Sequence, residues 1–372
     1  MNLALLTDFL EKKEQPPFRL KQATRAFYVE LQDSWDSVTA WPAALREEAK
    51  VAVPWTVMTP VHTQESKEGD TVKTLFACQD GAKIETVLMR HEDGERNTVC
   101  ISCQVGCPMG CTFCATGTMG LKRQLTADEI VEQVVFYVRW LRKKGEAEEK
   151  PDRAVNVVFM GMGEPMNNYD EVMKAVRLMN SKNGLGLGAR HISISTCGVV
   201  PGILKLADEP EQVNLAVSLH SAIDDTRTRI MPVNRAYDTT KLMRAVRTYV
   251  EKTNRKVFFE YLMLKGINDT AAEADAVADL LQDNPRLYHV NVIKYHDTDM
   301  YESTTRDGRM EFIARLRERG IPVTHRRTFG EDIDAACGQL AVNEAEGKLV
   351  QGHAAIKANR AGKRIRGVVS SS

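Results

Sequence analysis

Long hydrophobic runs are absent from this 372-residue sequence, and so is an excess of charge of either sign. No uninterrupted apolar stretch approaches the roughly 20 residues of a membrane-spanning helix. The first ten residues carry no basic segment ahead of an apolar run, so we expect no signal peptide, no membrane partner and a cytoplasmic location. The 50 basic and 50 acidic side chains cancel. This balance argues against strong binding to nucleic acid regardless of sequence, because counterion release needs clustered cations.

What is present is an ordinary globular composition with many cysteines. Apolar residues make up 43% of the chain and charged residues 27%, which suits one large α/β domain with a smaller appendage. Basic clusters do occur at residues 122–123, 139–144, 326–327 and 357–366, so composition leaves RNA binding open. Eight cysteines in a cytoplasmic chain indicate metal or redox chemistry, since stable disulfide frameworks belong to oxidising compartments.

Three of the cysteines form one short motif, Cys107-Pro-Met-Gly-Cys111-Thr-Phe-Cys114. Spacings of three and two residues place the three thiols in a single tight loop, as a [4Fe–4S] cluster requires. Three ligands leave one iron open, and the amine and carboxylate of a small molecule can chelate it. S-Adenosylmethionine (SAM) does so in radical SAM enzymes, whose Cys-x3-Cys-x2-Cys signature this motif resembles.

Zinc is the alternative for the same region. Cys100, Cys103, Cys111 and Cys114 form two Cys-x2-Cys pairs, which structural zinc sites also use. The spacer in such zinc sites is about 15–20 residues, whereas seven residues separate these pairs. Spacing and context therefore favour the iron–sulfur interpretation.

The periodicity of apolar residues predicts a helical module, a β-hairpin and then alternating strands and helices. Strands are expected at residues 71–78, 82–90, 98–102, 154–160, 191–196, 213–219, 256–263, 287–293 and 322–327, and helices at 19–32, 43–49, 126–144, 169–180, 201–207, 239–253, 271–281 and 309–319. The expected division is an accessory domain at 1–60, a hairpin extension at 61–92, the main domain at 93–336, and a C-terminal cysteine loop with a basic tail at 337–372.

Alternation of strand and helix implies parallel pairing through right-handed crossovers. About six β/α units are too few for the closed eight-unit barrel, so we expect an open, partial (β/α)6 barrel with ligands at the strands' C-terminal ends. Polar groups follow successive strands there. They are Gly161-Met-Gly-Glu-Pro165, Ser195-Thr196 and Ser218-Leu-His220.

Glu85 lies in the second hairpin strand on the same face as Val87 and Met89, because side chains alternate along a strand. A carboxylate among apolar neighbours has its charged form disfavoured, which is one way to make a proton acceptor. A solvated strand glutamate is the simpler interpretation, and the residues alone favour it.

Several stretches together resemble the RlmN/Cfr family of radical SAM adenosine methyltransferases of 23S rRNA. They are Pro17-Phe18-Arg19, Cys100-Ile-Ser-Cys-Gln-Val-Gly-Cys107, Gly161-Met-Gly-Glu-Pro165, Ser218-Leu-His220 and Asp332-Ile-Asp-Ala-Ala-Cys-Gly-Gln-Leu340. The resemblance spans nearly the whole chain and is closest to RlmN. It implies a radical SAM partial barrel with an N-terminal accessory domain, and transfer of a methyl group from SAM to an adenine ring carbon.

The family's functional residues map onto this sequence position by position. The resemblance assigns the cluster to Cys107, Cys111 and Cys114, the SAM contacts to Gly163, Glu164, Ser195, Ser218, Leu219, His220 and His296, and the catalytic roles to Glu85, Cys100 and Cys337. Three positions depart from the family pattern: His296 replaces an asparagine that contacts SAM, Gln124 replaces an asparagine, and Cys103 replaces a serine.

The resemblance also implies how these residues act. Cys337 carries the methyl group as a thioether, Glu85 removes the ring proton, and Cys100 releases the product by forming a transient disulfide with Cys337. The implied substrates are 23S rRNA, at adenine carbon 2, and tRNA. An external electron donor and a thiol reductant are needed, and we expect a monomer.

Three alternatives remain at this point. A Cfr-like enzyme methylates carbon 8 instead of carbon 2. A radical SAM enzyme for another RNA, such as a tRNA methylthiolase, usually carries a second set of three cysteines, for which Cys78, Cys103 and Cys197 are too scattered. A non-enzymatic iron–sulfur or zinc module that binds ribosomal RNA gives no reason for Cys337 in its motif.

Overall fold

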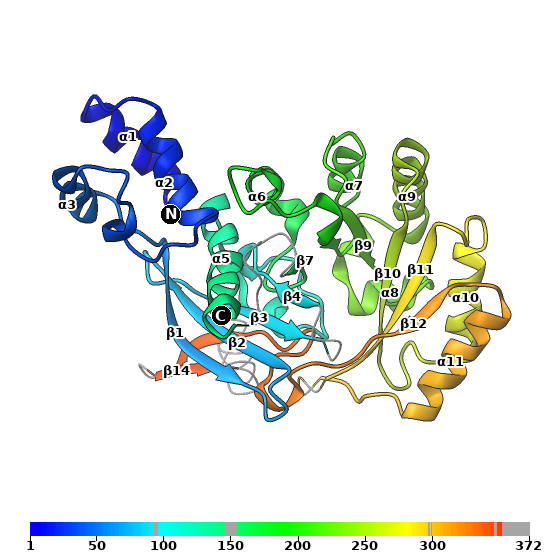
Figure 1. The fold of residues 1–372 in the computed structure, drawn as a ribbon. Helices are drawn as coiled ribbons and strands as arrows, with labels where there is room; N and C mark the ends of the chain where they lie inside the picture. The colour runs from blue at the N-terminus through cyan, green and yellow to red at the C-terminus, as the bar shows by residue number, and fades with distance from the viewer. Residues whose placement is uncertain (92–95, 146–154, 297, 299, 346–347, 352–372) are drawn as a thin grey trace, which may run out of the picture.

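The computed structural model describes residues 1–91, 96–145, 155–296, 298, 300–345 and 348–351. Within these residues a ten-stranded sheet runs in the order β1-β2-β3-β4-β7-β8-β9-β10-β11-β12. Its first strands are antiparallel, and from β4 to β12 all neighbours are parallel. The sheet curves with helices on its outer side (Figure 1), and in the described part of the chain it ends at β1 and β12 without closing. The predicted α/β class and open partial barrel are confirmed.

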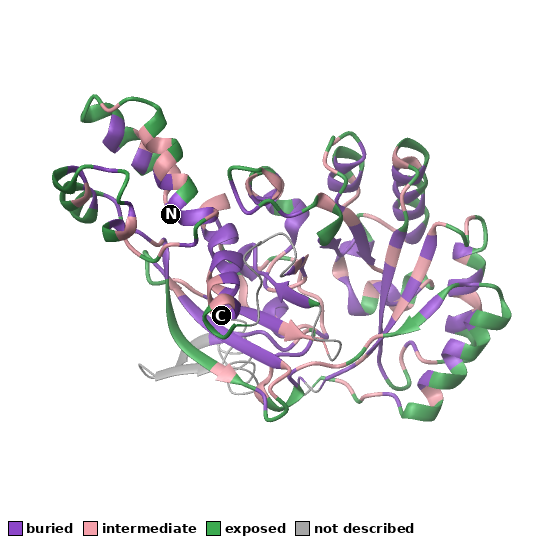
Figure 2. Cartoon of the chain, viewed as in Figure 1, coloured by how far each residue is buried: buried purple, intermediate pink, exposed green. Residues whose placement is uncertain are grey.

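The seven parallel strands alternate with helices, as the periodicity predicted. The strands are β4 (Asn97–Cys100), β7 (Asn156–Phe159), β8 (Ile192–Thr196), β9 (Asn214–Ser218), β10 (Val257–Met263), β11 (Tyr288–Lys294) and β12 (Val323–His325). The helices between them are α5 (Ala127–Lys143), α6 (Tyr169–Asn180), α7 (Val200–Leu206), α9 (Thr239–Thr253), α10 (Ala271–Leu281) and α11 (Arg306–Glu318). Figure 2 shows that most of these strand residues, and the helix faces that pack against the sheet, are buried.

Helix α5 begins where its sequence signature places it. The Thr126 hydroxyl accepts a hydrogen bond from the Glu129 amide, and the Glu129 carboxylate accepts one from the Thr126 amide. This capping box satisfies two amides that have no partner inside the helix. Along the helix, Ile130, Val134 and Val138 are buried against the sheet.

The N-terminal helices form a separate lobe beside the sheet (Figure 1), comprising α1 (Leu3–Lys12), α2 (Phe18–Tyr28) and α3 (Ala43–Ala52). Three tryptophans hold this lobe together. The Trp35 ring stacks on Trp41 at 5.2 Å and meets Trp55 edge-on at 4.8 Å between centroids. The indole N–H of Trp35 donates to the Val53 carbonyl at 2.7 Å. Helices α2 and α3 match predicted segments, whereas α1 was missed.

The predicted hairpin is present as β2 (Thr71–Cys78) and β3 (Lys83–Arg90), joined through Gly81 at a positive φ of 81°. A further strand, β1 (Met58–Glu65), pairs with β2 and was not predicted. Most of β1 is exposed and its register shifts between Pro60 and His62, so it lacks the alternation that marks a half-buried strand. Because β1 begins before residue 60, it crosses the boundary predicted between the accessory domain and the hairpin extension. The division of the chain into four domains stays a prediction.

Short elements make up the rest. They include β5 (Gln104–Cys107), α4 (Ala115–Met119), β6 (Gly120–Gln124), α8 (Asp224–Ile230), β13 (Val342–Ala345) and β14 (Lys348–Gln351), none of which was predicted. The basic tail at residues 357–366, the first residue of the strand expected at 154–160, and residue 297 beside His296 lie outside the described residues.

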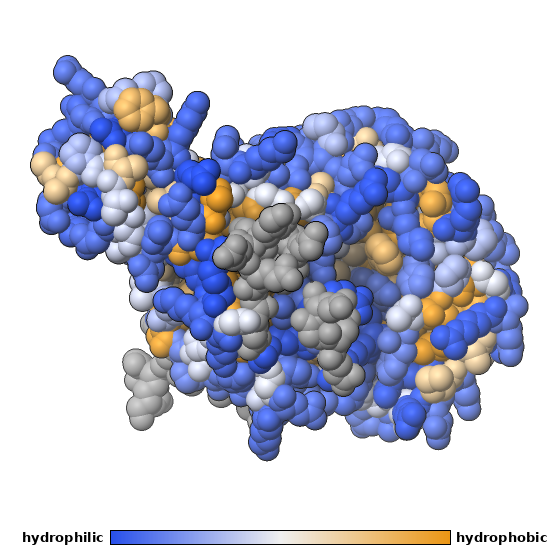
Figure 3. Space-filling view, viewed as in Figure 1, coloured by the Kyte–Doolittle hydropathy of each residue, from blue (hydrophilic) through white to orange (hydrophobic). Residues whose placement is uncertain are grey.

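The described helices include none that is long and apolar enough to cross a membrane. Figure 3 shows a mainly hydrophilic face with separate apolar areas, including one on the N-terminal lobe. Singly exposed apolar residues such as Phe18 and Val51 in that lobe are ordinary for a globular surface.

Candidate active site

Two adjoining cavities lie at the C-terminal ends of the parallel strands. The first, which we call the barrel cavity, is lined by Cys107, Met109, Cys111, Phe113, Cys114, Phe159, Met160, Gly161, Gly163, Glu164, Ser195, Thr196, Cys197, Ser218, His220, Met231, Glu260, Leu262, Ile293, Arg326, Cys337 and Gly338. The second, the Cys100 cavity, is lined by Val87, Met89, Cys100, Val158, Met160, Ile293, His296, Arg326, Arg327, Thr328, Phe329, Ala335, Ala336, Cys337, Gly338 and Leu340. Parallel pairing aligns the strand ends at one edge, which is where such barrels bind ligands.

The three motif cysteines lie on the hairpin-like unit β5–α4–β6. Cys107 ends β5, and Cys114 precedes the first residue of α4. Gly106 makes the close return of the chain possible, because a Cβ there would lie 1.9 Å from the Gly120 carbonyl oxygen and its φ is 77°. All three thiols therefore reach the barrel cavity from one compact loop.

The donor set fits an iron–sulfur cluster better than a single metal ion. Burial raises the pKa of Cys107 to about 12 and raises those of Cys111 and Cys114. A bound cluster would replace these protons, since metals bind the thiolate. Among the described residues, no three His, Cys, Asp or Glu side chains converge on one ion position. A cuboidal cluster takes its thiolates on separate irons, so three cysteines from one loop suit it.

The turn after β7 brings backbone and a carboxylate to the same cavity. Gly163 has a φ of 107°, and a Cβ there would lie 2.6 Å from the Gln104 side chain. The Glu164 carboxylate accepts hydrogen bonds from the amides of Met166 at 3.0 Å and Cys197 at 2.8 Å. Burial raises the pKa of Glu164, and those hydrogen bonds oppose the rise. A buried carboxylate facing the cavity can accept hydrogen bonds from a ligand's ammonium group.

The next strand ends add Ser195 from β8 and Ser218 from β9, and both line the barrel cavity. His220 follows with a φ of 56°, an uncommon conformation for a residue with a side chain. Its Nδ1 accepts a hydrogen bond from the Leu262 amide at 3.0 Å, and its ring meets Phe113 edge-on. Leu219 differs from its neighbours: its side chain is fully buried in the hydrophobic core, and it is not among the residues that line the two cavities.

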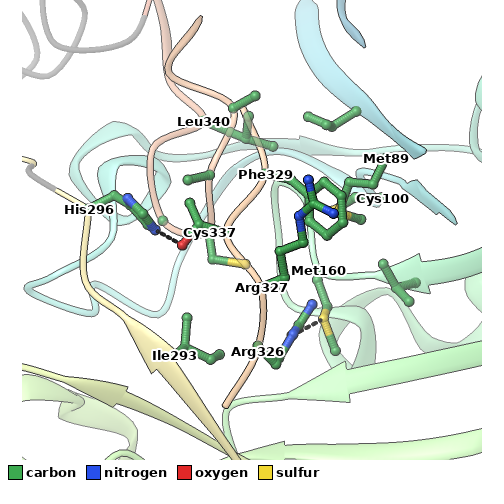
Figure 4. Close-up of a pocket in the computed structure, with 16 residues that line it drawn as sticks. Met89, Cys100, Met160, Ile293, His296, Arg326, Arg327, Phe329, Cys337 and Leu340 are labelled. Atoms are coloured by element: carbon green, nitrogen blue, oxygen red, sulfur yellow. Dashed lines mark hydrogen bonds between the residues drawn. The ribbon is translucent and has the colours of Figure 1, made fainter. Parts of the chain in front are cut away.

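Cys337 lines both cavities, so it joins the barrel cavity to the one that contains Cys100. Figure 4 shows Cys100 and Cys337 around the same space, with Arg326 and Met160 beside them. Both cysteines are free thiols; Cys100 is buried and Cys337 is exposed. Burial, followed by the neighbouring Cys337, raises the pKa of Cys100 to about 12, and Arg326 opposes this rise.

Arg326 and Glu260 were not predicted as site residues. The Arg326 Nη1 lies 2.9 Å from a Glu260 carboxylate oxygen, and Asn291 donates to the other oxygen at 2.9 Å. Both residues line the barrel cavity, and Arg326 lines the Cys100 cavity as well. A glutamate inside an otherwise apolar strand was the available signal for Glu260, because buried carboxylates are rare unless paired.

His296 lines the Cys100 cavity, which shares Met160, Ile293, Arg326, Cys337 and Gly338 with the barrel cavity. Its Nε2 is 3.4 Å from the Thr328 hydroxyl, and its Nδ1 is 3.4 Å from the Glu331 carboxylate. Burial lowers the pKa of His296. His296 thus lines the same cavity as Cys100 and Cys337, and its contact with SAM stays a prediction.

Glu85 is fully buried and lies outside the residues that line the two cavities. Its carboxylate pairs with Lys73 at 3.1 Å and accepts a hydrogen bond from the Ala341 amide at 2.9 Å. The solvated glutamate favoured by the residues alone is therefore wrong. The segment that carries Cys337 covers Glu85, which explains why this side chain is near the cavities without lining them.

Comparison with known proteins places these features in a family. A family model described as the radical SAM superfamily matches residues 101–281. The dual-specificity RNA methyltransferases RlmN of Staphylococcus saprophyticus and Bacillus pumilus are 46% and 43% identical to the chain, over 91% and 92% of both sequences. The crystal structure of a radical SAM methyltransferase from Sphaerobacter thermophilus matches with a TM-score of 0.85 and 44% identity, covering 91% of this chain and 97% of that one.

The chain belongs to the RlmN family of radical SAM methyltransferases. The region matched by the superfamily model includes the three loop cysteines, Glu164 and His220. The three residues with predicted catalytic roles, Glu85, Cys100 and Cys337, lie outside this region. Their roles, and those of the other predicted site residues, stay predictions. The RlmN relatives match along about nine-tenths of the chain, so family membership does not depend on the barrel alone.

The first prediction concerns His220. Burial, followed by nearby Arg227, lowers its pKa to about 3, so the folded protein keeps this imidazole neutral. The unfolded chain takes up a proton there below about pH 6.5, so His220 reduces stability as the pH falls through that range. In NMR spectra of 15N-histidine-labelled protein, the His220 imidazole, identified as the signal that His220→Asn removes, should not titrate between about pH 7.5 and 5. A His220 signal that titrates near pH 6.5 would contradict this assignment.

Proposed function

We propose that the protein methylates carbon 2 of an adenosine in 23S rRNA and in tRNA, acting in the cytoplasm as a monomer. Three kinds of support point the same way: the RlmN relatives, the barrel cavity with its three-cysteine loop, and the segment that carries Cys337. The names of the relatives supply the RNA and the dual specificity, while the proposed ring carbon comes from the resemblance to RlmN.

The observation that carries the proposal is the position of Cys337. It lines the barrel cavity, where the cluster cysteines are, and also the cavity that contains Cys100. One thiol can thus receive a group in the first cavity and meet a second thiol in the other. A zinc or iron–sulfur module that only binds RNA would not need this arrangement.

The residues of the barrel cavity fit SAM and a [4Fe–4S] cluster. Cys107, Cys111 and Cys114 would hold the cluster, while Glu164 and the backbone at Gly163 would face the amine of SAM. When bound, the two together would supply the methyl group and a 5′-deoxyadenosyl radical. Ser195, Ser218 and His220 line the rest of that cavity and would orient the ligand.

The thiols and the carboxylate perform the remaining steps. Cys337, as thiolate, accepts the methyl group as a thioether. One hydrogen atom of this methyl group would pass to the 5′-deoxyadenosyl radical, so that its carbon can bond to the adenine ring carbon. The one electron left over on this adduct would return to the cluster when the ring proton is lost. Glu85 accepts the proton that the ring carbon loses. The Cys100 thiolate then attacks the Cys337 sulfur: the S–S bond forms, the S–C bond breaks, and the released carbon takes up a proton as the new methyl group. An external thiol donates two electrons to reduce the disulfide, and an external donor reduces the cluster.

The second prediction tests the reaction itself. RNA treated with reconstituted enzyme, SAM and a reductant should contain 2-methyladenosine, measured by mass spectrometry of its nucleosides. Cys337→Ala should give none, because the methyl carrier is missing. Cys78→Ala is the matched control, since Cys78 lies in β2 away from both cavities. Finding 8-methyladenosine instead would move the enzyme to the Cfr type and overturn the proposed position.

The third prediction tests the cluster. Anaerobically reconstituted protein should hold about four irons per chain, and Cys111→Ala should lose most of this iron together with SAM cleavage. Iron and sulfide analysis and the visible absorption spectrum measure this without any RNA. Cys78→Ala should keep the iron. A Cys111→Ala protein that still cleaves SAM to 5′-deoxyadenosine would rule out the cluster assignment.

The fourth prediction concerns Cys100, which separates this mechanism from a purely structural role. Cys100→Ala should accept the methyl group on Cys337 and bond to the RNA, but it cannot break the S–C bond. The variant should therefore accumulate a protein–RNA adduct, visible as a shifted band on a denaturing gel after nuclease digestion. The double variant with Cys337→Ala should show no adduct. Normal product formation by Cys100→Ala without the shifted band would make Cys100 structural.

A further inference from the structure

A buried ion pair lies directly under the segment that carries Cys337. Lys73 and Glu85 expose only 2% and 0% of their side chains, and Lys73 Nζ is 3.1 Å from Glu85 Oε1. In the β2–β3 register Lys73 is opposite Val87, and Leu75 is opposite Glu85, so the pair reaches diagonally across one face of the hairpin. Lysine is almost never fully buried unless it is paired, so this placement calls for a reason.

Both members of the pair also bind the backbone of the Cys337 segment, residues 334–341. Lys73 Nζ donates to the Asp334 carbonyl at 3.2 Å, three residues before Cys337. The Ala341 amide donates to Glu85 Oε2 at 2.9 Å, four residues after Cys337. The pair thus holds the segment on both sides of its cysteine.

The charged groups that face Glu85 are Lys73 from β2 and Asp334 from the Cys337 segment. The neighbouring β4 side contributes the neutral hydroxyl of Ser102, which donates to the Glu85 carbonyl at 2.6 Å. Burial raises the pKa of Glu85, and Asp334 adds to the rise, whereas Lys73 and the Ala341 amide lower it. Lys73 is therefore the strongest influence that favours the ionised form of this carboxyl against its burial.

We propose that Lys73 is a positioning residue of this enzyme, which keeps Glu85 ionised as the proton acceptor and fastens the segment that carries Cys337 above it. The inference rests on the proposed function of Glu85 and extends it to a residue outside both cavities. It also links two events. When the proton of the ring carbon moves to a Glu85 oxygen, the carboxylate charge disappears, and both the ion pair and the Ala341 hydrogen bond weaken. Proton transfer would thereby loosen the segment just before Cys100 must reach the Cys337 sulfur.

The fifth prediction follows from removing the cation. Without Lys73 the pKa of Glu85 rises further, so a smaller fraction of this base is ionised at neutral pH and its activity shifts to higher pH. In Lys73→Met, the protein–RNA adduct should decay about tenfold or more slowly at neutral pH. The pH of half-maximal decay should rise by about 1 to 3 units. Lys73→Arg keeps the charge and should restore the wild-type profile.

The measurement is a single-turnover time course of adduct decay on denaturing gels across a pH series. If removal of the ring proton limits the rate, RNA deuterated at carbon 2 of the target adenine should make the adduct decay more slowly than unlabelled RNA does. Lys174→Met is the matched control: it makes the same substitution in an exposed ion pair with Glu171 on α6, and its profile should equal that of wild type. Lys73→Gln removes the charge but keeps a donor for the Asp334 carbonyl, so it should shift the profile as Lys73→Met does.

The outcomes distinguish this inference from the proposed function. If wild-type protein forms no adduct and no methylated RNA, the proposed function fails. If wild type completes the reaction and Glu85→Gln stalls, but Lys73→Met and Lys73→Gln keep the wild-type pH profile, only the role of Lys73 is overturned. If both of these variants fail to fold while Lys174→Met folds, the pair is structural, and the positioning role is overturned as well.

Discussion

Parallel pairing from β4 to β12 is the constraint on which the site depends. Each parallel strand must be followed by a crossover, so all seven strands end at the same edge, and the residues that follow them meet there. The carboxylate of Glu164 and the imidazole of His220 come from turns far apart in sequence, yet they share the barrel cavity. Because the sheet stays open in the described part of the chain, the antiparallel strands β1 to β3 continue it on one side and bring Glu85 beneath the Cys337 segment.

Buried charge is the second feature of this edge, and two of the charged groups there are held by specific partners. Arg227 is fully buried, and its guanidinium donates to the carbonyls of Leu219 at 3.1 Å and Cys197 at 2.8 Å, at the ends of two strands that supply the barrel cavity. Glu260 pairs with Arg326 between the two cavities. Groups of this kind are costly to bury without partners, so the same contacts that neutralise them also hold the strand ends in place.

Sequence patterns sufficed for the parts of the fold governed by regular periodicity. The parallel strands, helix α9 at Thr239–Thr253 and the capping box of α5 follow directly from apolar spacing and helix-start residues. Strand β1 was missed because an exposed edge strand has no apolar face to reveal it. At the site, the cysteine loop was recognisable because its ligands are local. Two ion pairs at the site could not be predicted in this way. They join residues 12 and 66 positions apart, Lys73 with Glu85 and Glu260 with Arg326, and a local sequence pattern does not show which distant residues pair.

For the proposed reaction, two adjoining cavities would have an advantage over one. The proposed methyl carrier would lie near the cluster in the barrel cavity, whereas the proposed second thiol, in the other cavity, would be kept away from the methyl donor. Cys337 lines both cavities, while Cys100 lines only the second and is buried among apolar side chains that raise its pKa. In the proposed reaction, a protonated Cys100 would be a poor acceptor for the methyl group of SAM, because the thiolate, not the thiol, is the nucleophile. Burial and the neighbouring Cys337 raise the pKa of Cys100, whereas Arg326 opposes that rise, so Arg326 favours the thiolate that the proposed second step requires.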